Sequence, residues 1–243
     1  MGVIIFANQS SKDVGIEVET FPTYNIAEKE YTAVHVPGRN GDVIIDNGTY
    51  RNTQRQYRVS IATYDTSYHQ KMAAVAKWLH SSTGYSRLED SYEPDFFFQA
   101  YYKESVSIEN LFNEAGRATL TFECKPQRFL KSGDLPIIFT SGSTTQIRNS
   151  TTQISLPLIE VTTDNSQGVV SINGVRVTIL ANSGTNIIID SELQDAYNNQ
   201  DVNKNPFIVL NDGEFPTLRP GINSIAFSGG VQSISLKPRW WVI

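Results

Sequence analysis

Apolar and polar residues alternate in short runs along most of the chain, and residues typical of turns separate these runs. In "VVSINGVRVTI", Asn173 and Gly174 lie between two apolar runs. Asn-Gly accommodates the two positive φ angles of a type I′ turn, whose twist matches paired strands. The stretch "TAVHVPGRNGDVIID" repeats the arrangement around Asn40 and Gly41, and "DNGTYRN" adds a turn at residues 47–48. The pattern predicts a mainly β protein with several hairpins.

One segment has a helical period instead. In "YDTSYHQKMAAVAKWLHSSTGY", apolar residues recur at a spacing that places them on one helix face: Met72, Val75, Ala76 and Leu79. Residues 65–67 offer N-cap side chains, and Gly84 follows the end of the pattern. We expect one amphipathic helix over about residues 67–81, packed on a sheet.

Two long strand-like stretches follow the helix, with a turn predicted near residues 113–116. The first stretch contains a run that is apolar on both faces of a strand: Phe96, Phe97, Phe98, Tyr101 and Tyr102. Such a strand is buried either between layers of its own fold or against another molecule. The internal position is favoured because the helix can cover one side, and the run also remains a candidate oligomer interface, together with Asn40 and Gly41.

A change of composition suggests two domains. Residues 131–153 are rich in Ser, Thr, Gly and Asn, which is typical of a junction. We therefore expect an N-terminal β domain with the helix at 1–135, a polar junction at 136–152, and a C-terminal β-sandwich at 153–243.

The net charge argues against nucleic acid as a ligand. The net charge is -5, whereas binding of a phosphate backbone needs a basic patch. A mildly acidic surface suits a passage through which DNA slides without binding. The apolar run 3–7 lacks a basic leader and is too short for a signal peptide or a membrane span, so we expect a protein kept in a cytoplasm, without a membrane anchor.

No enzymatic motif emerges. His35, His69 and His80 fall in no metal or triad motif, so surface or packing roles are expected and neither metal nor cofactor is predicted. The single cysteine, Cys124, is expected to be a buried, inert thiol. Gly229 and the glycine after it are read as a hairpin turn, because a phosphate loop would need Lys-Ser/Thr and a helix.

A carboxylate cluster keeps one catalytic alternative open. Glu89, Asp90, Glu93 and Asp95 lie beside aromatic residues, as in a glycosidase cleft, but "RLEDSYEPD" also has the proline and charge of a solvated turn. Sequence neighbours on one turn are seldom aimed across a substrate at the separation that acid/base chemistry needs. The turn is the favoured interpretation, and a glycoside hydrolase fragment is the alternative.

The last stretch, "FPTLRPGINSIAFSGGVQSISLKPRWWVI", carries a family likeness. It resembles the C-terminus of distal tail proteins (the Dit family) of long, non-contractile-tailed phages and prophages of Gram-positive hosts. The resemblance rests on these residues: Phe215, Pro216, Leu218, Pro220, Gly221, Asn223, Gly229, Pro238, Arg239, Trp240 and Trp241. "INGVRVTI", "IIIDSELQDAY" and "ATLTFECKPQRF" agree with the family in order and spacing, so the likeness covers almost the whole chain.

The resemblance implies a structural protein of the virion tail tip, assembled in the bacterial cytoplasm. It implies an N-terminal domain that closes into a six-membered ring and a galectin-like C-terminal sandwich. It also implies partners: the tail-tube protein, a tail-associated hub or lysin protein, and a receptor-binding protein or its adaptor. The chain lacks the residues of a galectin sugar site. A monomeric carbohydrate-binding adhesin is the alternative function, and the oligomeric state separates the two.

The adjacent tryptophans raise a separate expectation. Neighbouring residues of a strand point to opposite faces, so Trp240 and Trp241 cannot both enter one core. We expect one of them in the core of the sandwich and the other against the N-terminal domain or a neighbouring molecule.

Overall fold

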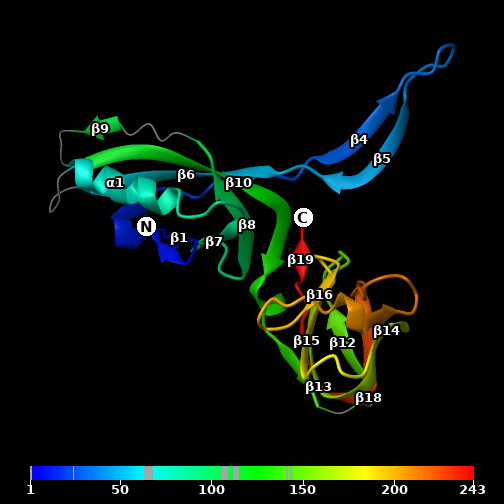
Figure 1. Cartoon of the computed structure of the whole chain (residues 1–243). Coiled ribbons are helices and arrows are strands. Elements are labelled where there is room, and N and C mark those ends of the chain that lie inside the picture. The colour runs from blue at the N-terminus through cyan, green and yellow to red at the C-terminus, as the bar shows by residue number, and fades with distance from the viewer. Residues whose placement is uncertain are drawn as a thin grey trace. The chain divides into compact units, whose positions relative to one another are not determined.

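The computed structural model describes residues 2–23, 25–62, 68–104, 109–111, 115–140, 142 and 144–243. These form two compact units, Met1–Arg128 with Ile243, and Phe129–Val242 (Figure 1). The predicted mainly β class with a helix in the N-terminal half is confirmed. The boundary lies a few residues before the predicted position 135, inside the long strand β10 (Ala115–Leu130). Among the described residues, no helix is long and apolar enough to cross a membrane.

The first unit is a curled sheet with a helix. Its elements are β1 (Ile4–Phe6), β2 (Gln9–Ser10), η1 (Ser11–Val14), β3 (Ile16–Val18), β4 (Lys29–Val34), β5 (Val43–Tyr50), β6 (Thr53–Ala62), α1 (Tyr68–Leu79), β7 (Ser86–Asp90), β8 (Phe96–Tyr102), β9 (Glu109–Leu111) and β10 (Ala115–Leu130). The strand order of the main sheet is β2-β1-β7-β8-β10-β6-β3. A bridge joins Gly2, just before β1, to Val18 in β3 at the far end of this order, so the sheet curls around its core.

Helix α1 lies against this core. It confirms the helix predicted over 67–81, although the proposed N-cap residues 65–67 lie outside the described residues. Val75, Trp78 and Leu79 are almost fully buried, whereas Ala76, which was expected on the same face, is exposed. Trp78 takes that place because its larger ring reaches the interior, where its Nε1 donates to the Phe6 carbonyl at 3.3 Å.

The second unit is built on two long strands. Its elements are η2 (Lys131–Gly133), β11 (Ile137–Phe139), β12 (Thr145–Asn149), β13 (Leu158–Ile172), β14 (Val175–Ile179), β15 (Asn186–Asp190), β16 (Asp195–Tyr197), η3 (Asn205–Phe207), β17 (Ile208–Leu210), β18 (Gly221–Lys237) and β19 (Trp241–Val242). Strands β13 and β18 pair along most of their lengths, with a register break between Thr162 and Gly168.

The break divides the sheet into two layers around one core. On one side of the break, β15 pairs with the first half of β13 and β11 pairs with the last part of β18. On the other side, β14 pairs with the second half of β13 and β12 pairs with the first part of β18. The predicted hairpin turn at Gly229 is wrong, because this residue lies inside β18 at the bend. A glycine is required there: φ is +67°, and a Cβ atom would come within 2.5 Å of the Gln167 carbonyl oxygen. The chain thus bends without leaving the sheet.

The predicted junction at 136–152 differs from the structure. It contains β11 and β12, both paired with β18, so it belongs to the second unit. Phe139 is buried in that core and Ile147 packs against it. The polar composition misled the sequence interpretation because β12 is an edge strand that is largely exposed.

The Asn173-Gly174 hairpin is confirmed. It joins β13 to β14 with Ile172 paired to Val175, and the two turn residues have φ of 53° and 89°. Both angles are positive, as a type I′ turn requires.

Candidate functional site: an exposed hairpin arm

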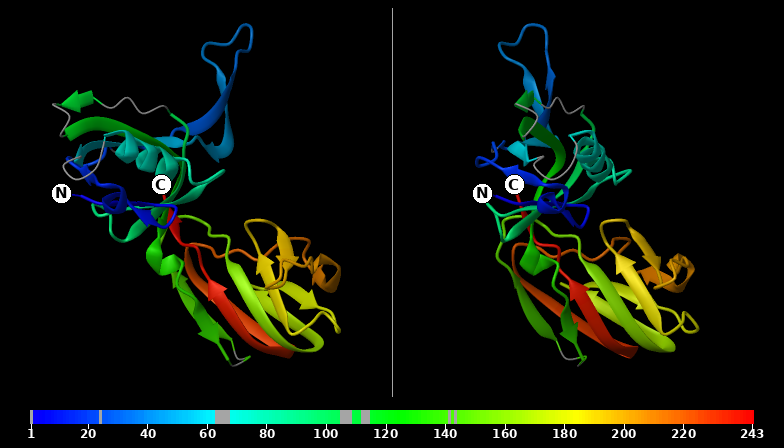
Figure 2. Two further views of the ribbon diagram at one scale, coloured as in Figure 1. Left: turned by 60° about the vertical axis from the view of Figure 1, so that its left-hand side comes forward. Right: turned by 90° about the vertical axis from the view of Figure 1, so that its left-hand side faces the viewer.

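Strands β4 and β5 form a separate two-stranded sheet, which we call the arm. It extends away from the curled sheet of the first unit (Figures 1 and 2). The predicted hairpin around Asn40 and Gly41 is confirmed, but its connection is longer than a two-residue turn and spans residues 35–42, between Val34 and Val43. A two-stranded ribbon without further packing is only marginally stable in water, so the arm is the element of this unit that gains most from a partner.

The predicted turn at residues 47–48 is wrong, because both residues lie inside β5. The strand register shifts between Lys29 and Tyr31, on the β4 side of this position. Gly48 has φ of +72°, and its N–H donates to Asp46 Oδ1 at 2.9 Å. The Asn-Gly pair therefore forms a bulge, which increases the local twist of the ribbon instead of reversing the chain.

Both faces of the arm are apolar towards its outer half. Directly paired residues share a face, so Val34 lies on the side of Ile45, and Ile44 lies on the opposite side with Tyr31. The exposed fractions are 42% for Val34, 51% for Ile45, 59% for Ile44 and 55% for Tyr31. Exposed apolar patches of this kind mark interaction sites in soluble proteins.

The inner half of the arm is held by polar side chains. Lys29 pairs with Asp46, and Glu30 accepts hydrogen bonds from Thr49 Oγ1 at 2.7 Å and Arg51 Nε at 3.2 Å. The hydrogen bonds from Thr49 and Arg51 hold the pKa of Glu30 below its ordinary value. These contacts join β4 to β5 and the residue after it, and so fix the register on which the apolar pairing farther out depends.

The aromatic run of β8 lies mainly inside the first unit. Phe97, Phe98 and Tyr102 are almost fully buried, and the last two belong to the core. Phe96 and Tyr101 are half-buried. The favoured internal position of the run is thus observed, and only these two half-buried rings have surface left for an oligomer contact.

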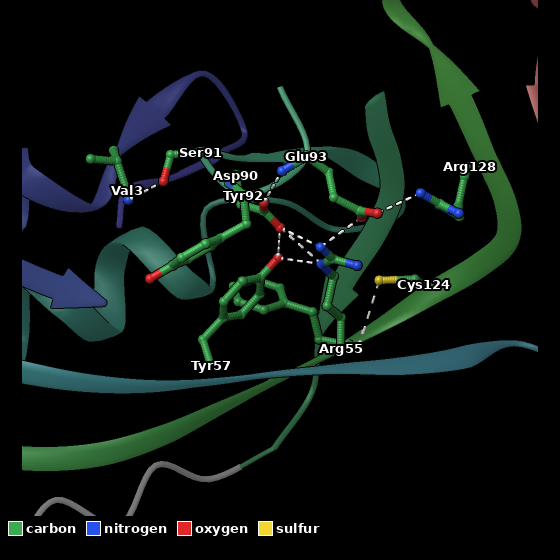
Figure 3. Close-up of polar contacts among 10 residues, drawn as sticks. Val3, Arg55, Tyr57, Asp90, Ser91, Tyr92, Glu93, Cys124 and Arg128 are labelled. Atoms are coloured by element: carbon green, nitrogen blue, oxygen red, sulfur yellow. Dashed lines mark hydrogen bonds and ion pairs between the residues drawn. The ribbon is translucent and has the colours of Figure 1, made fainter. Parts of the chain in front are cut away.

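Two carboxylates of the cluster at 89–95, Asp90 and Glu93, belong to one network of ion pairs (Figure 3), whereas Glu89 pairs with Arg87. Arg55 Nη2 lies 2.7 Å from Asp90 Oδ2 and 2.8 Å from Glu93 Oε2, and Arg128 also pairs with Glu93. Tyr57 Oη donates to Asp90 Oδ2 at 2.7 Å. The side chains of Arg55 and Asp90 are 6% and 0% exposed.

The environment of this network favours a structural role. Burial alone would lower the pKa of Arg55, but Tyr57 and the carboxylates of Asp90 and Glu93 hold it above its ordinary value. Burial raises the pKa of Tyr57 well above its usual range. Both carboxylates therefore lie against a guanidinium that stays charged, as in a structural ion-pair network. The solvated-turn interpretation was incomplete, because Asp90 faces the interior.

The remaining candidates for chemistry lie apart from one another. His69 and His80 are exposed, and the His80 ring meets Tyr102 edge-on at 5.7 Å. Cys124 is buried, and burial raises the pKa of its thiol to about 12. Within the described ranges, no group of three His, Cys, Asp or Glu residues is arranged to hold a metal ion.

The terminal motif organises the second unit. Arg239 has φ of +55° and makes a bidentate pair with Asp190, at 2.7 and 2.9 Å. The backbone N–H of Arg239 donates to the Gly133 carbonyl at 2.7 Å, and a Cβ at Gly133 would come within 2.3 Å of the Trp240 nitrogen. The left-handed backbone conformation of Arg239 costs about 1 kcal/mol of free energy. The charged hydrogen bonds to Asp190 offset this cost.

The two tryptophans have different environments. Trp240 is 8% exposed and belongs to the core of the second unit, as expected of one member of the pair. Trp241 is half-buried, and its Nε1 donates to the Ile154 carbonyl at 2.9 Å. That hydrogen bond lies within the second unit. The predicted contact of Trp241 with the other domain or a neighbour stays a prediction.

The Pro-Gly-x-Asn pattern has a structural explanation. Asn223 is fully buried, and its Oδ1 accepts from the Arg219 N–H at 2.8 Å and from Asn173 Nδ2 at 2.7 Å. Its Nδ2 donates to the carbonyls of Arg219 and Gly221. Gly221 has φ of +91°, which permits the turn before β18. One amide thus ties this turn to the Asn173 hairpin.

The other residues of the motif occupy ordinary structural positions. Pro216 and Pro238 are buried, Phe215 packs against the core and Pro220 is exposed at the turn. Together with Asn223 and Arg239 they account for the family-like stretch as a folding signature of the second unit.

Sequence reasoning missed two features. The exposed apolar side chains of the arm were not singled out, although "DVIID" is an apolar run next to a long Gly-rich connection. The partners of Asp90 were also missed, and no sequence signal identifies them, because Arg55 precedes it by 35 residues.

Comparison with known proteins agrees with the resemblance at the level of fold. No protein-family model matches the chain, and no curated protein matches it in sequence. The structure is similar to the crystal structure of the Dit protein (gp 19.1) of phage SPP1, over 100% of both chains, with a TM-score of 0.76 and 12% sequence identity. That protein is described as a paradigm of the hub adsorption apparatus in phages that infect Gram-positive bacteria. This chain therefore has the fold of a phage distal tail protein from end to end.

Proposed function

We propose that this chain is a structural protein of a phage tail tip and that its copies assemble into a ring, six-membered as in the family it resembles. The observation that carries the proposal is the full-length likeness to the SPP1 Dit protein. The likeness covers 100% of this chain, so both units are included in it. A shared single domain would be weaker support, because one β-sandwich serves many unrelated functions.

The arm supplies a surface suited to such assembly. A closed ring needs a head-to-tail contact between two different patches of each subunit. The arm projects from the first unit and is apolar on both faces, with Ile44 and Ile45 more than half exposed. We assign it as one of the two patches, with Asn40 and Gly41 in its tip connection and with Phe96 and Tyr101 as further candidates. Burial of the arm against the next copy removes apolar surface from water and stabilises the ribbon.

The remaining partners follow from the same proposal. A ring at the tail tip joins the tail-tube protein to a hub or lysin protein and carries a receptor-binding protein or its adaptor. DNA passes through it without specific binding, which agrees with the net charge of -5 per chain. Six copies multiply this charge, and an inward-facing share of it repels DNA in transit. The assembled protein resides at the virion tail tip after assembly in the bacterial cytoplasm.

The test measures solution mass by light scattering behind a sizing column, with negative-stain images of the same peak. The arm variant Ile44→Ser/Ile45→Ser should shift the mass from ring to single chain, whereas the melting temperature stays within a few degrees of the wild type. The matched control is Ile222→Ser, which removes an even more exposed isoleucine (66%) from the second unit. It should leave the ring intact.

The outcomes separate the two functions. Rings that disappear only in the arm variant support the proposal. A wild-type chain that remains a single chain at high concentration, and binds cell-wall glycans, would favour the monomeric carbohydrate-binding adhesin. Rings that survive in the arm variant would remove the arm from the interface while leaving the ring itself in place.

A further inference from the structure

Asparagine followed by glycine is the pair most prone to spontaneous deamidation. The backbone nitrogen of the glycine attacks the side-chain carbonyl, and no Cβ hinders the approach. Asparagine is accordingly one of the thermally labile residues. The chain contains this pair at residues 40–41, 47–48 and 173–174. The structure places the three pairs in different environments, so they form an internal comparison.

The pair at residues 40–41 is unrestrained. Asn40 lies in the connection of the arm, outside the strand pairing that ends at Val34 and Val43, and is exposed. A Cβ on Gly41 would meet nothing within 4 Å. Among the described residues, no hydrogen-bond partner lies within reach of the Asn40 side chain. The attacking nitrogen and the target carbonyl are thus free to meet.

Hydrogen bonds restrain the pairs at residues 47–48 and 173–174. Asn173 Nδ2 donates to Asn223 Oδ1 at 2.7 Å, and Asn173 Oδ1 accepts from the Ser224 N–H at 3.0 Å. Both ends of that amide are engaged, inside a tight turn between paired strands. Asn47 Oδ1 accepts from Thr32 Oγ1 at 3.0 Å, and the attacking nitrogen of Gly48 donates to Asp46. Reaction at either pair requires these hydrogen bonds to break first.

We propose that Asn40-Gly41 is a site of spontaneous, enzyme-independent modification at the tip of the arm. The Gly41 nitrogen loses its proton and bonds to Cγ of Asn40, the bond from Cγ to Nδ2 breaks, and ammonia leaves with the proton. One water molecule then opens the cyclic imide at either carbonyl. The product is aspartate or isoaspartate at position 40. No oxidant or cofactor takes part.

The modification changes the charge at the arm tip. Residues 35–42 contain one cation, Arg39, and one anion, Asp42, which lies 3.3 Å from His35 Nδ1. A new carboxylate at position 40 gives the connection a net negative charge while His35 is neutral. The isoaspartyl product also adds a methylene group to the backbone of the tip. The fraction of chains with an altered arm tip therefore increases with the time that a chain spends unassembled, and the change is irreversible.

The experiment incubates the folded protein at mildly alkaline pH and 37 °C and maps peptides by mass spectrometry over time. Because a ring could cover the arm tip, single chains are used, or the Ile44→Ser/Ile45→Ser variant if the wild type does not dissociate. We expect the amide-to-acid mass change at position 40 at least ten times faster than at positions 47 and 173. In 8 M urea the three rates should become similar, since the folded environment is lost.

The Asn40→Gln variant is the control for the reaction at position 40. Asn40→Gln should abolish the fast reaction, because the ring that glutamine would form is less favourable, and should leave the rates at the other positions unchanged. Equal rates at the three positions in the folded chain, or a folded chain in which position 40 remains unmodified, would overturn the inference. Neither result would bear on ring formation, which is measured by mass.

Discussion

The buried pair of Arg55 and Asp90 allows a prediction whose size follows from the structure. In Arg55→Met the side chain keeps most of its length and loses its charge and donors. Asp90, with a fully buried carboxylate, is then left without its cation. Removing one partner of a buried ion pair costs about 3 to 5 kcal/mol, because the remaining charge stays away from water.

We expect a loss near the lower end of that range. Asp90 retains the hydrogen bond from Tyr57, and its Oδ1 still accepts from the backbone N–H groups of Tyr92 and Glu93. The predicted loss in the free energy of unfolding of the first unit is therefore about 3 kcal/mol. For a unit of this size it corresponds to a fall in melting temperature of about 10 °C.

Calorimetry is the suitable assay, because the two units can unfold in separate transitions. Only the transition of the first unit should move. Arg117→Met is the matched control: Arg117 pairs with Glu19 at 2.9 Å, but its side chain is 65% exposed, so the loss should be below about 1 kcal/mol. Adding Asp90→Asn to Arg55→Met should recover part of the loss. Equal effects of Arg55→Met and Arg117→Met would refute the reasoning.

Three further predictions concern other parts of the chain. Trp240→Ala should destabilise the second unit by about 3 to 5 kcal/mol in chemical denaturation, whereas Trp241→Ala should cost clearly less; unchanged melting temperatures for both would disprove the packing described. Burial alone would raise the pKa of Asp190, but Arg239 and two backbone N–H groups hold it below its ordinary value. The pair with Arg239 should therefore stabilise the fold above about pH 4 and lose its contribution as the pH falls through the lowered pKa, and Asp190→Asn should flatten this acid limb in a series of melts. Cys124, whose pKa burial raises to about 12, should resist a thiol reagent at pH 8 in the folded chain and react in urea; rapid reaction without urea would contradict its burial.

The sequence determined the local structure of this protein. The helical period between residues 68 and 79 and the Asn-Gly turn at 173–174 both specify their elements through short-range chemistry. The terminal stretch also indicated the fold of the second unit. Asn223 ties a turn to the hairpin at Asn173, Arg239 pairs with Asp190, and both contacts require particular residue types. That combination is recognisable in the sequence before the contacts are known.

Tertiary structure alone decided the features that depend on distant partners. Gly229 and the bulge at Asn47 have the composition of turns, and only the neighbouring strands show that the chain continues through them. Asp90 belongs to a polar sequence, yet its carboxylate is buried, because Arg55 of strand β6 neutralises its charge. The exposure of Ile44 and Ile45 was equally hidden, since an apolar run predicts burial, and only the folded chain shows that its own core leaves them uncovered. Local propensities act over a few residues, whereas burial and charge pairing depend on the whole fold.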